Sequence, residues 1–438
     1  MKITVIGTGY VGLVQAVGLA ELGHEVVGMD HDVAKVRRLQ AGDPVIYEPG
    51  LAERLREQQA SGRLRFTTEM AVAVRHAPVL FICVGTPPRP DGSADLSQLE
   101  AVVRQVARAM DSYRLVVEKS TVPVRTSSWV HRTLRLYAPR GVEFDVASNP
   151  EFLREGRAIE DFFNPDRIVL GVTSERAAAL LNEVYASFKC PKIVTDPNTA
   201  EIIKHASNSF LALKISYINL IADLCERTQA DVHIVAKAMG LDPRIGPQFL
   251  EAGLGYGGAC LPKDIQAFIA IGEEHGLDFS LLREADEINR GRVDVVLQKL
   301  RRALWNLEGK QVAILGLAFK ANTDDVRGSQ GLAVARALLE QGARVRLYDP
   351  HAGGRARGIV PPSESVYHAD GVWDALQDAD AAVIATPWDE IRALDLVRMV
   401  RTMTTPIVVD GRNLLDPQAA RAAGIEYHPV GRPPVHLL

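Results

Sequence analysis

The 438-residue sequence is poor in cysteine and has no paired cysteine motif. Its four cysteines are Cys83, Cys190, Cys225 and Cys260, and no two of them stand in a CxxC pattern. This wide spacing argues against a disulfide framework and against a zinc site, so we expect no bound metal. It favours a protein of the reducing cytoplasm, in which at most one or two of the thiols carry chemistry.

Long apolar runs and an excess of positive charge are also missing. No apolar run reaches the roughly 18–20 residues that span a bilayer. The amino-terminal stretch MKITVIGTGYVG turns into a glycine loop, so we interpret it as a strand and not as a signal peptide. The net charge of −4 argues against a nucleic-acid-binding protein, which would need a basic face. Neither a membrane nor a nucleic acid is therefore expected as a partner.

Two stretches of the chain show the alternation of strand and helix patterns that is typical of α/β folds. In the first, β-branched runs at 3–6, 25–29, 79–84, 115–120 and 167–172 are separated by helical patterns. Buried strands separated by helices predict a parallel sheet covered on both faces. A second such unit begins near Lys310, with expected strands at 311–316, 344–349, 381–386 and 406–411 and an expected loop at 353–358.

The stretch between these units predicts a long helix. Residues 198–227 contain neither glycine nor proline, and apolar residues recur at helical spacing. They predict one helix of about thirty residues, or about 45 Å, with a capping box of Asn198 and Glu201. Such a helix would serve as a spine alone, or as a spine and a dimer interface. The predicted fold is α/β, with two Rossmann-like parallel-sheet domains joined by a long central helix and a helical middle region.

The first βα turn carries a dinucleotide fingerprint. GTGYVG at 7–12 matches GxGxxG directly after an expected strand and at the start of an expected helix. Gly7 would make the tight turn, Gly9 would let the backbone approach a pyrophosphate, and Gly12 would let the helix pack on the sheet. Asp30 follows Gly12 by 18 residues at the end of the next strand. Its carboxylate would accept bonds from the adenine ribose and repel a 2′-phosphate, which favours NAD over NADP.

Two basic positions near possible phosphate sites are open to more than one interpretation. Lys35 would reach the ribose or phosphate, although alone it is more typical of a solvated helix. The first turn of the second unit, residues 316–329, has Phe319 and Lys320 where the fingerprint needs small residues. It should not bind NAD in the same way. Lys320 and Arg327 would meet phosphates at the carboxyl end of that sheet, or they are surface charges.

A glycine-rich loop ends in a cysteine. Within GLGYGGACLPKD at 253–264, glycines stand at 253, 255, 257 and 258, and Cys260 follows them. Such a backbone lets a ligand approach closely. A nearby cation would favour the thiolate form of Cys260, and Lys263 is the candidate for that cation. A lone cysteine is more often a small buried hydrophobe, and we interpret Cys83, Cys190 and Cys225 in that way.

Two pairs of polar residues stand at a spacing of four. Lys204 and Asn208 would share a face of the long helix, where the lysine and the asparagine could stabilise an oxyanion. Spacing alone would equally fit a polar stripe on a solvated helix. Glu151 and Glu155 lie in NPEFLREG at 149–156, close after a strand end, and could manage protons or water. Spacing alone does not separate that role from capping.

A dinucleotide fold combined with a nucleophilic cysteine indicates a specific chemistry. A hydride acceptor takes an alcohol to an aldehyde, and a thiolate adds to the aldehyde as a thiohemiacetal. Loss of a second hydride gives a thioester, which water hydrolyses to an acid. One site would thus perform two oxidations without releasing the aldehyde.

Together these motifs resemble the UDP-glucose/GDP-mannose dehydrogenase family over nearly the whole chain. The matching segments, in family order, are GTGYVG at 7–12, CVGTP at 83–87, STVP at 120–123, NPEFLREG at 149–156, KHASN at 204–208, GYGGACLPKD at 255–264 and LGLAFKANTDDVR at 315–327. The resemblance implies an NAD-binding domain at 1–196, a central helical dimerisation domain at 197–308 and a UDP-sugar-binding domain at 309–438. It also implies a homodimer formed through the central helix.

The resemblance also implies roles for individual residues. Cys260 would be the nucleophile, and Asp264 would assist oxidation and hydrolysis with an ordered water. Lys204 and Asn208 would stabilise the oxyanion, Thr121 would position water and touch NAD, and Glu151 would take part in thioester hydrolysis. The implied cofactor contacts are Gly7, Gly9, Tyr10, Val11, Gly12, Asp30, Lys35, Thr86, Thr121, Glu155, Lys263 and Arg327. The implied substrate contacts are Glu151, Phe152, Leu153, Arg154, Glu155, Lys204, Asn208, Phe249, Leu250, Glu251, Ala252, Gly253, Gly257 and Lys320.

Several functions remain open at this point. PDRIVLG at 165–171 and DGRN at 410–413 favour UDP-glucose as the substrate, oxidised to UDP-glucuronate with two NAD. Leu261 in the cysteine loop also occurs in GDP-mannose enzymes, and UDP-N-acetylhexosamine dehydrogenases are a third possibility. A two-electron β-hydroxyacid-type dehydrogenase would need no Cys260 loop, and a non-catalytic NAD-sensing scaffold would need no catalytic set.

Overall fold

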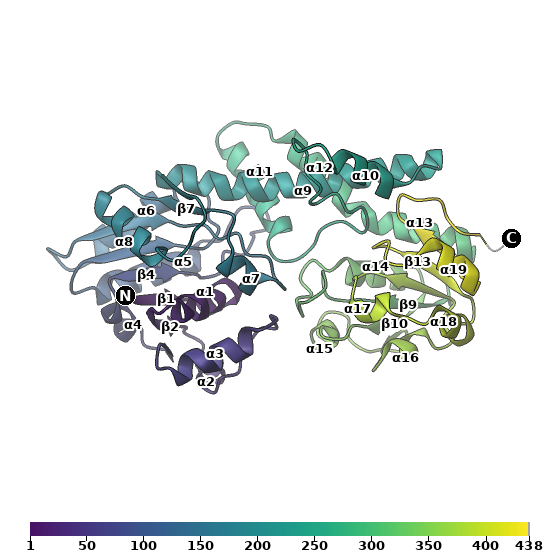
Figure 1. Ribbon diagram of the computed structural model, residues 1–438, viewed down its shortest axis with the longest axis horizontal. Helices are drawn as coiled ribbons and strands as arrows, with labels where there is room; N and C mark the ends of the chain where they lie inside the picture. The colour runs from purple at the N-terminus through teal and green to yellow at the C-terminus, as the bar shows by residue number, and fades with distance from the viewer. Residues whose placement is uncertain (437–438) are drawn as a thin grey trace. The chain divides into compact units, whose positions relative to one another are not determined.

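The computed structural model describes residues 1–436 (Figure 1). By packing, the chain forms two compact units. The first consists of Met1–Ser207 and Gln266–Asp278, and the second consists of Asn208–Ile265 and the chain from Phe279 onwards. Each unit contains one parallel sheet with helices around it, which confirms the expected α/β class. The predicted domain limits at 196 and 308 stay predictions.

The sheet of the first unit has eight strands among the described residues, in the order β3-β2-β1-β4-β5-β6-β7-β8. Neighbouring strands are parallel except β6 and β7, which meet antiparallel. The strands are β1 (Lys2–Ile6), β2 (Glu25–Met29), β3 (Leu64–Thr67), β4 (Val79–Ile82), β5 (Arg114–Glu118), β6 (Phe144–Ser148), β7 (Ile168–Gly171) and β8 (Lys192–Thr195).

Helices cover both faces of this sheet, so its central strands β1, β4 and β5 are buried at nearly every position. Along β4, Val79 and Phe81 enter one core, whereas Leu80 and Ile82 enter the other, as the pleat of a strand dictates. The first core is covered by α1 (Tyr10–Glu21) and α3 (Leu51–Ala60), and the second by α4 (Met70–His76), α5 (Ser97–Ala109) and α6 (Thr126–Tyr137) (Figure 1). The remaining helices before residue 197 are α2 (Val33–Gln40), α7 (Ala158–Phe163) and α8 (Glu175–Val184).

The strand order predicts where a ligand would bind at this sheet. The chain leaves β1 toward β2 on one side and later returns to β4 on the other, so the connections diverge between β1 and β4. Ligands of open parallel sheets bind at such a point, beyond the carboxyl ends of the strands. Gly7 follows β1 there, and Cys83 follows β4.

The sheet of the second unit repeats this plan with six strands among the described residues, in the order β11-β10-β9-β12-β13-β14. Its strands are β9 (Gln311–Leu315), β10 (Arg344–Tyr348), β11 (Val366–His368), β12 (Ala381–Ile384), β13 (Ile407–Asp410) and β14 (Glu426–Pro429). Its helices are α12 (Ser280–Arg290), α13 (Arg292–Leu304), α14 (Gln330–Leu339), α15 (Gly353–Arg357), α16 (Val372–Leu376), α17 (Asp389–Arg392), α18 (Leu396–Thr402) and α19 (Pro417–Ala423). The connections diverge between β9 and β12, which places the turn after β9 at the corresponding crevice.

The long central helix is confirmed as α9, which runs over the 32 residues Pro197–Thr228 (Figure 1). It passes from the first unit to the second at Ser207–Asn208. The shorter α10 (Val232–Gly240) and α11 (Leu261–Glu274) follow it. In the described part of the chain, helices long and apolar enough to cross a membrane are lacking.

Two local expectations about helices were wrong. The capping box of Asn198 and Glu201 does not form, because Asp196 caps α9 by accepting a hydrogen bond from the Thr199 amide at 3.0 Å. The expected loop at 353–358 contains the short helix α15, whose Ala356 is buried in the core of the second unit. The five strands that the sequence pattern missed are β3, β6, β8, β11 and β14.

Candidate functional site

The glycine turn after β1 has the geometry of a dinucleotide site. Gly7 has a φ of +92°, and a Cβ on Gly12 would lie 1.8 Å from the Gly7 carbonyl oxygen, so both positions require glycine. Helix α1 begins directly after Gly9, and within residues 1–436 no side chain caps it. The amides of its first turn, at Tyr10 and Val11, thus lack intrahelical partners and are available to an anionic ligand.

Asp30 stands at the end of β2 as a fixed carboxylate. Its Oδ2 accepts hydrogen bonds from the amide and the hydroxyl of Thr8, each at 2.9 Å, and from Lys35 Nζ at 2.9 Å. Its Oδ1 accepts from the Asp32 amide at 3.1 Å. Burial alone would raise the pKa of Asp30, but the hydrogen bonds from Lys35, Thr8 and Asp32 hold it below its ordinary value. An ionised acid at this position suits a ribose diol and opposes a 2′-phosphate, so these residues fit NAD.

Lys35 is not the solvated helix residue that its sequence context suggests. Its ammonium group forms an ion pair with Asp30, and its side chain is 28% exposed. It therefore orients the carboxylate that would face the ribose.

Thr121 lies in the connection between β5 and α6, which we call the Thr121 segment (residues 119–125). Thr86 Oγ1 donates to the Thr121 carbonyl at 2.8 Å, and Ser120 Oγ donates to the Val84 carbonyl at 2.6 Å. On the other side, His205 Nε2 of α9 lies 2.8 Å from the Val122 carbonyl oxygen. The segment is thus held at the carboxyl end of the first sheet by two other parts of the chain, residues 84–86 and His205 of α9.

Glu151 and Lys204 form a buried ion pair. Lys204 Nζ donates to Glu151 Oε1 at 3.0 Å and to the Glu151 carbonyl at 2.7 Å. Their side chains are 7% and 5% exposed. Glu151 Oε2 accepts in addition from the Leu153 amide at 2.5 Å. The structure therefore brings together a carboxylate and an ammonium group that the sequence places 53 residues apart.

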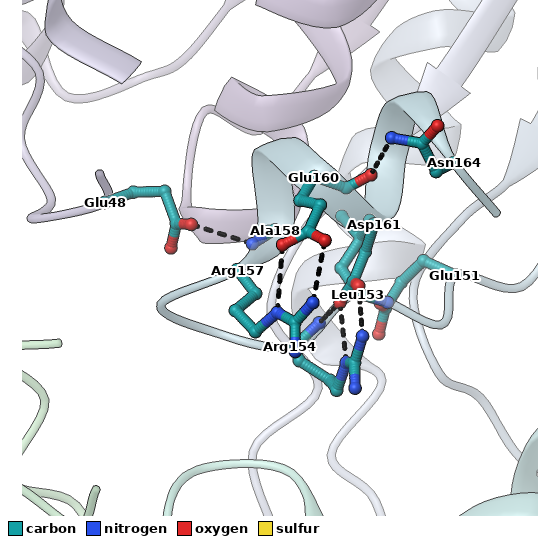
Figure 2. Close-up of polar contacts among 9 residues, drawn as sticks. All are labelled: Glu48, Glu151, Leu153, Arg154, Arg157, Ala158, Glu160, Asp161 and Asn164. Carbon is teal, nitrogen blue, oxygen red and sulfur yellow. Dashed lines mark hydrogen bonds and ion pairs between the residues drawn. The ribbon is translucent and has the colours of Figure 1, made fainter. Parts of the chain in front are cut away.

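The NPEFLREG segment is a loop and not a helix, so the spacing of Glu151 and Glu155 puts them on no common helical face. Carboxylates bind two arginines here (Figure 2): Asp161 binds the guanidinium of Arg154 in the loop, and Glu160 binds that of Arg157, directly after the loop. Phe152 lies beneath two cations, with the Arg167 guanidinium 3.7 Å and Lys204 Nζ 5.4 Å from its ring centroid. Leu153 and Glu155 are half-buried.

Glu48 anchors the end of this loop and was missed by sequence reasoning. Its carboxylate is buried and accepts hydrogen bonds from the amides of Gly156 and Ala158, each at 2.7 Å. Figure 2 shows the bond to Ala158. The Tyr10 hydroxyl accepts from the Gly156 amide at 2.8 Å, so the loop also contacts the first residue of α1. The sequence offered one signal, an acidic residue before Pro49 and Gly50 in an otherwise apolar stretch.

In the second unit, the glycine-rich loop packs against the turns of the second sheet. A Cβ on Gly253 would lie 2.4 Å from the Gly411 carbonyl oxygen, and one on Gly257 would lie 2.2 Å from that of Gly328. The Gly253 amide donates to Asn219 Oδ1 at 2.8 Å. Just before the loop, Phe249 adopts a positive φ of 64°, Leu250 and Ala252 are buried, and Glu251 is exposed. These contacts fix the path of this backbone next to the turns of the second sheet.

At the end of this loop, Asp264 joins two of the expected catalytic residues. Asn208 Nδ2 donates to Asp264 Oδ2 at 2.6 Å, and Lys263 Nζ lies 2.6 Å from Asp264 Oδ1. The Asp264 amide donates to the Cys260 carbonyl at 2.8 Å. Lys263 was the candidate cation for the Cys260 thiolate, and in the structure its ammonium group pairs with Asp264.

The cysteines differ in exposure as the motif analysis requires. Cys260 is exposed, Cys190 is half-buried, and Cys83 and Cys225 are buried. Burial raises the pKa of Cys83 to about 12 and also raises the pKa of Cys225. Both buried thiols are therefore poor nucleophiles at neutral pH, because the thiolate is the reactive form.

The turn after β9 carries the remaining basic candidates. Lys320 is half-buried, with its Nζ 5.4 Å from the centroid of the Phe319 ring. Arg327 is exposed and pairs with Asp325. Nearby, Arg412 donates to the carbonyls of Ala385 at 2.7 Å and Gly255 at 3.2 Å, which connects the second sheet to the glycine-rich loop. Burial lowers the pKa of Arg412 to about 10.

Lys119 is a further buried group that sequence reasoning missed. Its Nζ donates to Asn149 Oδ1 at 3.0 Å, and burial lowers its pKa to about 8. It follows β5 as Asn149 follows β6, so both stand at the carboxyl edge of the first sheet. No motif marks a single lysine as buried, because lysine is ordinarily a surface residue.

Comparison with known proteins gives consistent matches along the chain. Three models of the UDP-glucose/GDP-mannose dehydrogenase family match: the NAD binding domain at residues 1–189, the central domain at 198–291 and the UDP binding domain at 313–417. A UDP-glucose 6-dehydrogenase of Rhizobium meliloti is 45% identical over 99% of this chain and 100% of its own.

Solved structures agree with this result. A UDP-glucose dehydrogenase from Pyrobaculum islandicum has a TM-score of 0.92 at 47% identity and covers 98% of each chain. A UDP-D-ManNAc dehydrogenase from Pyrococcus horikoshii has a TM-score of 0.88 at 31% identity, with 99% of each chain covered.

Proposed function

Because this chain belongs to the UDP-glucose/GDP-mannose dehydrogenase family, we propose that it oxidises UDP-glucose to UDP-glucuronate with two NAD per substrate. It is an NAD-dependent oxidoreductase that acts on an alcohol. The observation that carries the thioester mechanism is Cys260, the exposed cysteine at the end of the glycine-rich loop.

The proposed reaction proceeds in balanced steps. The C6 alcohol loses a hydride to the first NAD⁺ and a proton to a base, which gives an aldehyde. The Cys260 thiolate adds to the aldehyde carbon, and the resulting thiohemiacetal oxyanion loses a second hydride to a second NAD⁺. Water then cleaves the thioester, which releases the carboxylic acid and regenerates the thiol. Four electrons leave the substrate, and two NADH form.

The fixed polar groups suit the charges that develop in these steps. We propose that Lys204 and Asn208, one turn apart on α9, donate to the oxyanion of the thiohemiacetal. Asp264 assists oxidation and hydrolysis through a water, since its carboxylate is held by Asn208 and Lys263. Glu151 takes part in hydrolysis, and its carboxylate is held by Lys204. Thr121 positions water near the cofactor.

The first unit supplies the residues that would hold NAD. NAD accepts the hydride when bound. The first-turn amides of α1 would meet its pyrophosphate, and Asp30, oriented by Lys35, would accept hydrogen bonds from the adenine ribose. Further proposed cofactor contacts are Thr86, Thr121, Glu155, Lys263 and Arg327.

The second unit supplies most of the proposed nucleotide-sugar contacts. The backbone of Phe249–Gly253 and that of Gly257 would line the nucleotide-sugar site. Lys320 would neutralise phosphate charge. We prefer UDP-glucose to GDP-mannose and to UDP-N-acetylhexosamines because the UDP-glucose enzymes compared above share 45–47% identity with this chain, against 31% for the UDP-D-ManNAc enzyme.

A stoichiometry assay tests this proposal. The protein is incubated with NAD and limiting UDP-glucose, GDP-mannose or UDP-N-acetylhexosamine, and the NADH formed per sugar is counted. We expect two NADH per UDP-glucose and little free aldehyde. One NADH per sugar with aldehyde trapped in solution would refute the thioester route, and turnover of another sugar alone would change the substrate.

The variant Cys260→Ser tests the nucleophile directly. A serine hydroxyl has a much higher pKa than a thiol, so attack on the aldehyde becomes slow and any ester resists hydrolysis. We expect at most about one NADH per site, with an ester adduct visible by mass spectrometry. The control Cys190→Ser changes the same atom at a half-buried site and should keep full stoichiometry. Full turnover by Cys260→Ser would contradict the mechanism.

We further propose a homodimer formed through α9. Phe210, Tyr217, Leu220 and Leu224 are 60%, 46%, 51% and 56% exposed, and their spacing places them along one side of the helix. An exposed apolar stripe of this kind is typical of an interaction surface. Leu220→Asp should give a monomer in sedimentation experiments, whereas a wild-type monomer would exclude the proposal. The three-domain division at 196 and 308 and a cytoplasmic location complete the proposal.

A further inference from the structure

Two buried carboxyl groups of the first unit share one hydroxyl group. Ser127 Oγ, in the first turn of α6, lies 2.7 Å from Glu118 Oε2 and 2.7 Å from Glu201 Oε1. Glu118 is the last residue of β5, and Glu201 lies in the first part of α9. Glu118 is 1% exposed, Ser127 is 5% exposed and Glu201 is 2% exposed. None of them belongs to the catalytic or binding set proposed above.

Counting protons shows that one of the two carboxyl groups must be protonated. A serine hydroxyl has one proton to donate, and an ionised carboxylate can only accept. Two ionised carboxylates would therefore leave one of the short contacts without a hydrogen. The second hydrogen bond requires a carboxylic acid that donates to Ser127 Oγ.

The surroundings of the two carboxyl groups identify the protonated one. Glu201 accepts from the Arg125 amide at 2.6 Å and from the Ser127 amide at 3.0 Å, and such bonds favour the ionised form. Glu118 Oε1 is buried and has no hydrogen-bond partner among the described residues. An ionised carboxylate with an unpartnered buried oxygen is costly, whereas a neutral carboxyl tolerates it better.

We propose that Glu118 carries a proton at neutral pH and that this proton makes it a positioning residue for the Thr121 segment. The protonated carboxyl donates to Ser127, and Ser127 donates to Glu201. These hydrogen bonds link Glu118, at the end of β5, through Ser127 of α6 to Glu201 of α9. Glu201 lies three residues before Lys204. This inference rests on the proposed function for the roles of Thr121 and Lys204.

The charges around the pair support this assignment. Burial, and to a smaller extent the charge of Glu201, raise the pKa of Glu118 to about 8, against the opposing effect of the Ser127 hydrogen bond. Burial also raises the pKa of Glu201, against the hydrogen bonds from Ser127 and Arg125, and Asp196 adds a smaller effect in the same direction as burial. Lys119, the next residue along the chain, binds Asn149 instead.

The position of the pair makes its proton relevant to activity. The Thr121 segment begins directly after Glu118 and ends where Glu201 holds the amides of Arg125 and Ser127. If Glu118 ionises, two negative charges face one hydroxyl, and the Glu118–Ser127 bond is lost. We therefore expect the segment to loosen above pH 8, with a lower kcat as the result.

The sign of the stability effect follows from the same shift. The folded chain keeps a proton on Glu118 that the unfolded chain releases near the ordinary pKa of 4.5. The stabilisation from this group is complete below that value and is lost as the pH rises toward about 8. Glu118→Gln mimics the neutral acid, so its melting temperature should exceed that of wild type by a margin that grows from pH 5 to pH 8.

Infrared spectroscopy tests the proton without substrate. In wild type at pH 7, the difference spectrum against Glu118→Gln should show one buried protonated carboxyl band, which disappears as the pH is raised through 8. The matched control is Glu143→Gln, which removes a carboxylate that is 78% exposed. The difference spectrum of wild type against Glu143→Gln should show no such band. Absence of the band in wild type would overturn the proposal, even if the enzyme turns over UDP-glucose as proposed.

The pH profile of activity tests the positioning role. Between pH 7 and pH 10, wild type and Glu143→Gln should lose kcat on the alkaline side, and Glu118→Gln should lose less because its side chain cannot ionise. Ser127→Ala breaks the bridge and should lower kcat several-fold already at pH 7, with the KM for UDP-glucose little changed. Identical alkaline profiles for wild type and Glu118→Gln would refute the positioning role. If no variant turns over UDP-glucose, the proposed function fails while the infrared result still decides where the proton lies.

Discussion

Removal of Lys204 should destabilise the first unit strongly, because it leaves a buried carboxylate without its cation. Lys204 Nζ and Glu151 Oε1 are 3.0 Å apart, and both side chains are at most 7% exposed. Water can therefore solvate the remaining Glu151 only if the loop opens. Loss of one partner of a buried ion pair typically costs about 3–5 kcal/mol. We expect this range for Lys204→Met, which keeps the shape of the aliphatic chain.

A double-mutant cycle separates this electrostatic cost from lost packing. Glu151→Gln removes the negative charge but keeps an acceptor for Lys204. If the pair interacts as the structure shows, the double variant should be more stable than the sum of the single changes predicts, by about 1–3 kcal/mol. The free energy of unfolding of all four proteins is measured by urea denaturation followed by circular dichroism at pH 7.

The cycle has clear refuting outcomes. A loss below about 1 kcal/mol for Lys204→Met would mean that Glu151 finds water or another cation, as exposed pairs do. A coupling near zero would show that the two side chains do not interact in the folded protein. The measurement needs no substrate, so the catalytic role of Lys204 does not influence it. The control Arg154→Met breaks an ion pair in the same loop whose arginine is 46% exposed, and it should cost far less.

Further predictions concern individual contacts. Asp30→Ala should weaken NAD binding and narrow the preference for NAD over NADP, as measured by kcat/KM with each cofactor; equal use of both by wild type would exclude this role. Lys320→Ala should raise the KM for UDP-glucose far more than that for NAD, and equal effects would make it a surface lysine. Gly257→Ala places a Cβ 2.2 Å from a carbonyl oxygen and should cost about 1–3 kcal/mol in urea denaturation; an unchanged midpoint would contradict this packing. Glu48→Gln leaves one amide of the 149–156 loop without a carboxylate acceptor and should raise the KM for UDP-glucose several-fold, and unchanged kinetics would show that the loop holds its shape without Glu48.

Four of the five strands that the sequence pattern missed are edge strands and share a physical cause; the fifth, β6, lies inside the first sheet. β3 and β8 are the edges of the first sheet, and β11 and β14 are the edges of the second. An edge strand has one neighbour and less burial, so its residues need not be apolar throughout. In β8 the two central residues, Ile193 and Val194, are exposed. The central strands carry continuous apolar runs because both of their faces are covered. Such runs are visible in a sequence, and the pattern of an edge strand is much weaker.

Local chemistry was accessible from the sequence because it lies within short segments. The glycine turn at 7–12, the length of α9 and the loop that ends in Cys260 each depend on residues close together in the chain, where the backbone conformation and helical spacing are set locally. Asp30 followed from the regular length of a βα unit. These features were sufficient to predict the α/β class and the cofactor, whereas the chemistry of the site stays a prediction.

Only the tertiary structure decided which charged groups meet and which are buried. Glu151 forms an ion pair with Lys204, and Asp264 accepts a hydrogen bond from Asn208. Glu118 and Glu201 both contact the Ser127 hydroxyl. These partners come from different strands, helices and loops, and their separations along the chain follow no periodicity. Whether a carboxyl group carries a charge or a proton depends on its solvation and on the donors that surround it, and both arise only when the chain has folded.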